Sequence, residues 1–109
     1  DSTLVDVKTT EDASPEGFAK SIAKYGYARQ AAHYIEGTGA KDFIFIAVEK
    51  TAPYAVGVYR LDEFSLGQGR IEINRAKAAW DYALTHNMFH AYSEEVETIS
   101  LPNWAFDKE

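Results

Sequence analysis

The chain has 109 residues, of which 46% are hydrophobic and 14% are aromatic. This composition fits one domain with a hydrophobic core, and it excludes an intrinsically disordered chain. The formal net charge of -6 argues against a protein that coats nucleic acid through general positive charge, and the lack of cysteine excludes a disulfide scaffold and a thiolate zinc site. No run reaches the ~20 apolar residues of a membrane span, so we expect no membrane partner, and the lack of cysteine is compatible with the cytoplasmic location that we expect.

The first predicted element is a strand over residues 3–10, which carries Asp6 and Lys8 near its end. Alternation along a strand places these two side chains on one face, roughly 7 Å apart. An acid and a base on a buried strand are costly unless they have a partner or a function. Mg²⁺-assisted cleavage of a phosphodiester is one such function, and an ordinary ion pair facing solvent is the alternative.

A long helix is predicted next, from Pro15 to about Glu36, with Ser14 as its N-cap and the glycines at 37 and 39 as its stop. Gly26 lies inside this helix and can divide it. The apolar residues that recur at helical spacing, and that we expect to face the sheet, are Phe18, Ile22, Tyr25, Ala28, Ala32 and Ile35.

Two further strands are predicted after this helix. The continuous apolar run 43–48 is typical of a strand that is covered on both faces. Residues 54–59 form the next strand, antiparallel to the previous one through a short turn. Together with the first strand and the helix, the run 43–48 completes a βαβ unit with an expected right-handed crossover.

A second long helix is predicted from Asp62, its N-cap, to about His86. We expect residues 96–101 to form a short extended segment and residues 102–106 a last turn anchored by Trp104. The histidines at 33, 86 and 90 are scattered and predict no zinc site. The apolar stripe expected along the second helix consists of Phe64, Leu66, Ile73, Ala76, Trp80, Ala83 and Leu84.

Gln30 and Tyr34 are four residues apart on the first helix and therefore share a face. A Gln-x-x-x-Tyr pair is expected by chance about one time in eight here, so it is more specific than the acid-x-Lys triplet. If the helix crosses the sheet end that presents Asp6 and Lys8, Gln30 reaches the lysine, a phosphate or a metal-bound water, and Tyr34 a phosphate oxygen or a base. The alternative is a half-buried tyrosine beside an exposed glutamine.

The order of these motifs resembles the PD-(D/E)XK nuclease superfamily, in the RecB-like branch, where a (D/E)-x-K strand precedes a Gln-x-x-x-Tyr helix. Residues 45–51, 54–59 and 100–105 are similar to the C-terminal nuclease domain of the RecE (exonuclease VIII) family and its phage relatives. The resemblance covers nearly the whole chain. It implies a restriction-endonuclease-like α/β fold, with a central mixed β-sheet flanked by helices.

The resemblance also implies an exodeoxyribonuclease that depends on Mg²⁺, for which Mn²⁺ substitutes, and that degrades linear double-stranded DNA from 5′ to 3′ in homologous recombination or phage DNA processing. Its expected partners are duplex ends, a single-strand annealing protein and further copies in a homo-oligomer. By this likeness Asp6 and the Val7 carbonyl bind the metal, Lys8 is the catalytic lysine, and Gln30 and Tyr34 form the helix motif. The residues expected to contact DNA are Thr9, Thr10, Lys24 and Arg29.

One departure from the family pattern affects these expectations. The pattern has an acid, and in RecE relatives a histidine, on elements before the (D/E)-x-K strand, and Asp1 is too close to Asp6 to supply that acid. We therefore expect residues 1–109 to be a single partial nuclease domain, its C-terminal part, with little activity alone. Two alternatives stay open: a non-catalytic α/β binding or assembly module, and another (D/E)xK endonuclease.

Overall fold

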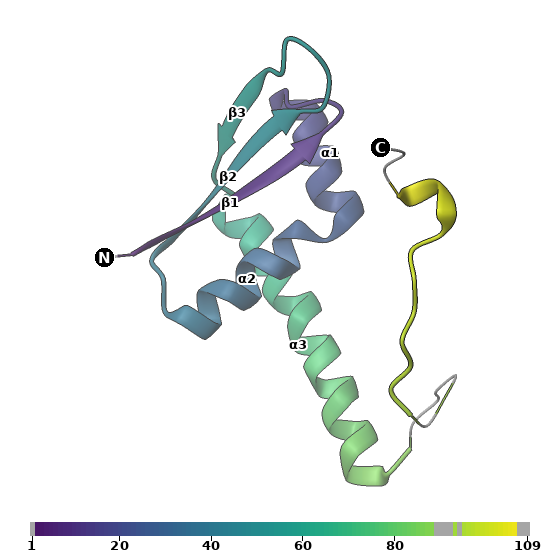
Figure 1. The fold of residues 1–109 in the computed structure, drawn as a ribbon. Coiled ribbons are helices and arrows are strands. Elements are labelled where there is room, and N and C mark those ends of the chain that lie inside the picture. Colours follow the sequence, from purple (N-terminus) through teal and green to yellow (C-terminus); the bar gives the residue numbers. More distant parts are fainter. Residues whose placement is uncertain (1, 89–92, 94, 107–109) are drawn as a thin grey trace.

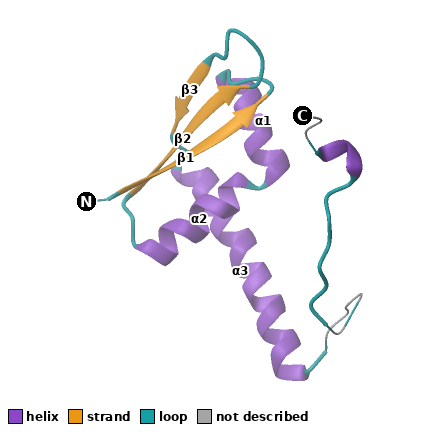
Figure 2. Ribbon diagram, viewed as in Figure 1, coloured by secondary structure: helices purple, strands orange, loops and turns teal. Residues whose placement is uncertain are grey.

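The structure, a computed structural model, describes residues 2–88, 93 and 95–106. It contains a β-sheet with helices packed against one of its faces (Figures 1 and 2). The elements in chain order are β1 (Thr3–Thr10), α1 (Pro15–Tyr25), α2 (Tyr27–Thr38), β2 (Asp42–Glu49), β3 (Val56–Tyr59), α3 (Glu63–His86) and the 3₁₀ helix η1 (Asn103–Ala105).

The sheet is mixed, with the strand order β1-β2-β3. β1 runs parallel to β2, so that Asp6 lies opposite Phe45 and Lys8 opposite Ala47, and β3 is antiparallel to β2. The parallel pair requires a crossover connection, which α1 and α2 provide. The predicted α/β class, the βαβ order and the antiparallel third strand are therefore confirmed.

The hydrophobic core lies between the sheet and the helices. Phe18 of α1 and Phe45 of β2 are its largest fully buried side chains, and their rings meet edge to face at 5.7 Å. The other buried residues of this cluster are Ala13, Ala31, Phe43 and Ala47. The partly buried side chains packed against it are Leu4, Ile22, Tyr27, Ile35, Tyr59, Leu61 and Leu66.

The opposite face of the sheet is open within the described residues. Val7 of β1 and Val58 of β3 are 60% and 63% exposed there, and Ile44 and Ile46 of β2 are only partly buried. The prediction that β2 is covered on both faces is therefore wrong. An apolar run shows that both faces of a strand can be buried, but it does not specify which other segment of the protein buries each face.

Gly26 divides the predicted long helix in two. It has a φ of 70°, in the left-handed region that glycine adopts readily, and its N–H closes α1 by bonding to the Ile22 carbonyl. The predicted stripe is wrong at Tyr25, at the end of α1, but it holds beyond the break, where Ala32 is buried and Ile35 packs against the core. Tyr25 is 57% exposed instead of facing the sheet, and Tyr27 and Ala31 turn toward the core in its place.

The remaining helix ends follow local capping rules. α2 continues through Gly37 to Thr38, slightly beyond its predicted end, and the left-handed Gly39 terminates it. The predicted N-cap of α3 is confirmed, since Asp62 Oδ1 accepts a hydrogen bond of 2.7 Å from the Ser65 N–H.

α3 lies against α2 as far as Lys77, whose Nζ is 2.6 Å from Glu36 Oε1. Gly69 is buried where the two helices cross, and a Cβ there would collide with the Ala28 carbonyl oxygen. The later turns of α3 extend away from the sheet (Figure 1). The apolar stripe predicted along all of α3 is therefore wrong at its ends, because Phe64, Trp80 and Leu84 are more than half exposed.

The C-terminal segment forms the predicted last turn, η1, but does not anchor it. Trp104 is 81% exposed, so the predicted anchoring role is wrong, and residues 96–101 form no strand. Asp1 and His90 lie outside the described residues. Across the described part of the chain, every helix is too short or too polar to cross a membrane.

Candidate active site

Asp6 and Lys8 lie together on the helix-covered face of β1. Lys8 Nζ is 3.0 Å from Asp6 Oδ2, and the two side chains are 17% and 28% exposed, respectively. The juxtaposition follows from strand periodicity, as predicted. Because α1 and α2 cover this face, the pair does not point into bulk solvent, and its charges interact more strongly than those of an exposed pair.

Gln30 comes from α2 to complete the cluster. Its Oε1 accepts a 2.7 Å hydrogen bond from Lys8 Nζ, and its Nε2 donates a longer one, of 3.5 Å, to the Tyr34 hydroxyl. Tyr34 is itself partly exposed and stacks on Phe43 of β2. The two motifs that are more than twenty residues apart in the sequence are therefore in direct contact through the lysine.

Asp6 has a carboxylate oxygen without a hydrogen bond. Its Oδ2 is buried and accepts none within the described residues, although Lys8 Nζ is close. The ion pair therefore rests on proximity, without the alignment of a hydrogen bond. A buried anionic oxygen in this state is costly, and it is a suitable ligand for a hard cation such as Mg²⁺.

Only one acid of the cluster is available for such a cation. The described residues contain no group of three or more histidine or acidic side chains placed to hold a metal ion. Asp6 thus fits a metal site as one ligand, and the described part of the chain does not complete the set that Mg²⁺ prefers.

Tyr27 also belongs to the cluster, although no role is predicted for it from the sequence. Lys8 Nζ lies over its ring, 4.3 Å from the centroid. Tyr27 precedes Gln30 by three residues, so both face the same side of α2. That spacing was the available signal, but it becomes informative only once Gly26 is known to start a new helix at Tyr27.

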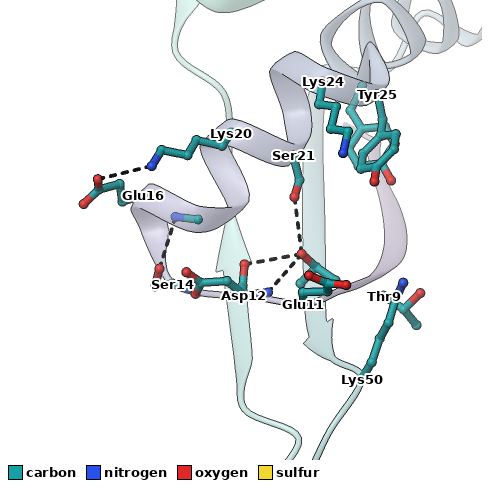
Figure 3. Close-up of a pocket in the computed structure, with 13 residues that line it drawn as sticks. Thr9, Glu11, Asp12, Ser14, Glu16, Lys20, Ser21, Lys24, Tyr25 and Lys50 are labelled. Carbon is teal, nitrogen blue, oxygen red and sulfur yellow. Dashed lines mark hydrogen bonds and ion pairs between the residues drawn. The ribbon is translucent and has the colours of Figure 1, made fainter.

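The predicted DNA contacts are divided between two places. Thr9, Thr10 and Lys24 line a hollow of about 780 Å³ between the end of β1 and α1, together with Lys50 (Figure 3). Arg29 does not reach it, because its guanidinium pairs with Glu72 of α3 at 3.0 Å. Three of the four residues therefore gather next to the strand that carries Lys8.

The side chains around this hollow differ in their burial and in their contacts. Thr10 is buried, and its hydroxyl is 3.3 Å from that of Ser21. Lys24 extends over the ring of Tyr25 at 5.3 Å. Lys24 can therefore reach a ligand in the hollow, whereas Thr10 joins β1 to α1.

The loop from β1 to α1 is fixed by hydrogen bonds at Ala13. Its N–H donates to Glu49 Oε2 at 3.0 Å, and its carbonyl accepts from the Tyr59 hydroxyl at 2.6 Å. In the same loop, hydrogen bonds from the backbone and then the side chain of Ser14 hold the pKa of Asp12 below its ordinary value. These contacts join one side of the hollow to β2 and β3.

A family model described as a PDDEXK-like domain of unknown function (DUF3799) matches residues 1–102. The chain belongs to this family. It is thereby a member of the PD-(D/E)XK nuclease-like superfamily, whose chemistry is hydrolysis of phosphodiester bonds and usually depends on a divalent metal ion. The superfamily predicted from the order of the two motifs is confirmed, and the narrower likeness to RecE stays a prediction. No curated protein matches the sequence.

Proposed function

We propose that this chain supplies the lysine and one metal-binding acid of an exodeoxyribonuclease that degrades linear double-stranded DNA, from 5′ to 3′ and with Mg²⁺. The observation that supports it most is the position of Lys8 Nζ, between Asp6 and Gln30 on one covered face of the sheet. This partly buried acid and base, of which the lysine contacts the Gln-x-x-x-Tyr helix, support a nuclease role in a chain that belongs to a PDDEXK-like family.

If Mg²⁺, or Mn²⁺ in its place, were bound at such a site, it would supply positive charge against the negative charge that develops on the phosphate. Asp6 Oδ2 and the backbone carbonyl of Val7 would hold it. Because Mg²⁺ prefers about six oxygen ligands, the remaining ones would have to come from groups outside the described residues.

Lys8 orients the attacking water or helps to remove its proton. An ammonium group has three N–H donors, and Gln30 Oε1 accepts one of them at 2.7 Å. The others remain for Asp6 and for a water or a phosphate oxygen. Gln30 and the partly exposed Tyr34 then hold the ammonium group in place and face the substrate side of α2.

The hollow next to β1 is the proposed place for the DNA backbone. Thr9 and Lys24 contact phosphate there, and the buried Thr10 keeps β1 and α1 together around it. Arg29 joins them only if DNA displaces Glu72 from its guanidinium. These roles, and the partners expected from the RecE likeness (duplex ends, a single-strand annealing protein and further copies of the chain), are part of the proposal.

A second candidate is a non-catalytic binding or assembly module. It is favoured by a specific observation, namely that no group of three or more histidine or acidic side chains in the described residues is placed to hold a metal ion. In this case Asp6 and Lys8 are a structural ion pair, and exchanging them affects only stability.

The test uses the full natural protein that contains this chain, incubated with linear and with covalently closed circular duplex DNA in the presence of Mg²⁺ or EDTA. We expect degradation of the linear DNA only, dependent on Mg²⁺, and a loss of at least about 100-fold for Asp6→Asn. Asp81→Asn, a matched change on the exposed part of α3, should have no effect. Cleavage of both substrates would indicate an endonuclease, and no cleavage of either would favour the module.

A further inference from the structure

Tyr27 lies directly against the ammonium group of Lys8. The ring centroid is 4.3 Å from Nζ, inside the distance at which a cation is attracted by the negative face of an aromatic ring. Lys8 therefore has three different neighbours: the Asp6 carboxylate, the Gln30 amide oxygen and the Tyr27 ring.

The core of the protein holds the Tyr27 ring in place. Its centroid lies 6.2 Å from that of Phe18 and 6.1 Å from that of Phe45, and both phenylalanines are fully buried. Tyr25 stacks on it from the outer side at 5.7 Å, with an angle of 29° between the rings. A ring packed in this way changes its position little, so it offers a fixed surface to a mobile cation.

The local backbone directs the ring toward β1. The left-handed conformation of Gly26 ends α1 and makes Tyr27 the first residue of α2. From there, Tyr27 and Gln30 are three residues apart and project from the same side of the helix. One helix turn therefore supplies two of the three groups that contact Lys8.

We propose that Tyr27 is a positioning residue for Lys8, and that its ring face, rather than its hydroxyl, does this work. The lysine side chain has a flexible four-carbon stem. The Gln30 amide oxygen and the Asp6 carboxylate attract its ammonium group, and the face of the Tyr27 ring limits how far the group can move. The contact itself is independent of the enzymatic role of Lys8, whereas its effect on catalysis rests on the proposed function.

The contact is tested first without DNA, on the chain itself. An aromatic ring shifts the NMR signals of protons over its face upfield, so the Lys8 ε-CH₂ signal, assigned by its loss in Lys8→Ala, should be upfield of the other lysines. Tyr27→Phe should keep this shift and Tyr27→Leu should abolish it, while Tyr82→Leu, the same change at an exposed position on α3, should leave it intact. An ordinary Lys8 ε-CH₂ shift in the unaltered chain would overturn the proposal.

The catalytic effect is tested in the full natural protein. We expect kcat to fall about tenfold in Tyr27→Leu with KM for DNA nearly unchanged, and to stay within about twofold in Tyr27→Phe. Equal loss in both variants would show that the hydroxyl matters instead and would contradict the proposal.

Fluorinated phenylalanines at position 27 resolve the case in which Tyr27→Leu does not fold. They keep the shape of the ring while weakening the negative charge of its face, so kcat should fall in steps with fluorine number at constant Tm. An unchanged kcat across the series would overturn the catalytic part of the proposal. If Lys8→Ala keeps full activity, the proposed function fails, and the NMR test still decides the contact.

Discussion

The two faces of β1 carry different side chains, and the charged ones lie on the face that also borders the hydrophobic core. On β1, the charged Asp6 and Lys8 point to the face covered by helices, while Val5 and Val7 point to the open face and are more than half exposed. Burial on the covered face holds charged groups in a fixed geometry against aromatic rings. The covered face therefore positions chemical groups, whereas in the described part of the chain the valines of the open face are largely exposed.

The largest expected difference between the faces is in stability. Phe45→Ala removes a fully buried ring from the covered face and should lower the free energy of unfolding by about 3–5 kcal/mol. Val58→Ala on the open face should cost less than about 1 kcal/mol, because its side chain is 63% exposed. Urea denaturation followed by circular dichroism measures both. Equal losses would mean that the open face is buried in solution.

The second prediction concerns the helix crossing that places α2 on the covered face. Gly69→Ala would direct a methyl group into the Ala28 carbonyl oxygen, and we expect a loss of about 2 kcal/mol with a shift of α2. Gly67→Ala is the matched control, since its Cβ would make only an ordinary contact of 3.8 Å with Arg70. It should stabilise α3 by up to about 1 kcal/mol.

Thermal unfolding distinguishes these two glycine variants. If Gly69→Ala is as stable as Gly67→Ala, the two helices do not approach as closely as the structure has them, and the placement of Gln30 over Lys8 loses its support.

A smaller effect is expected at the edge of the sheet, from an exposed ion pair. Arg60 donates hydrogen bonds of 2.8 and 2.7 Å to Asp42, and these hold the pKa of that carboxyl below its ordinary value of 3.8. A lowered folded-state pKa gives stability that is present above pH 3.8 and is lost as the pH falls through the lower value.

Arg60→Gln should therefore move the midpoint of acid unfolding to higher pH, with little change of stability near neutrality beyond the loss of a surface pair. A pH titration followed by circular dichroism measures this midpoint. If Arg60→Gln and the unaltered chain unfold at the same pH, the pair does not form in solution.

Much of the covered face could be predicted from the sequence, and the reasons are local. The shared face of Asp6 and Lys8 follows from strand periodicity, and the caps at Ser14 and Asp62 follow from their side chains. The contact between Lys8 and Gln30 is predicted only if the helix crosses the sheet near Lys8, and this crossing depends on tertiary packing.

The rest of the fold depends on tertiary packing, which a sequence pattern does not specify. The sequence predicts that Gly26 can divide the helix, but it does not predict that Tyr27, in place of Tyr25, faces the core and Lys8. Helical spacing predicts an apolar stripe along all of α3, whereas Trp80 and Leu84 near its end are more than half exposed. The apolar run of β2 likewise does not specify which of its faces is covered.

The most direct test of the account compares two alanine substitutions on the same strand of the full natural protein. Lys8→Ala removes the ammonium group on the covered face, and Val5→Ala trims an exposed side chain on the open face. We predict that Lys8→Ala lowers the Mg²⁺-dependent degradation of linear duplex DNA at least about 100-fold without unfolding the protein, and that Val5→Ala stays within about twofold of the unaltered enzyme. Full activity in Lys8→Ala, or an equal loss in both variants, would contradict the account.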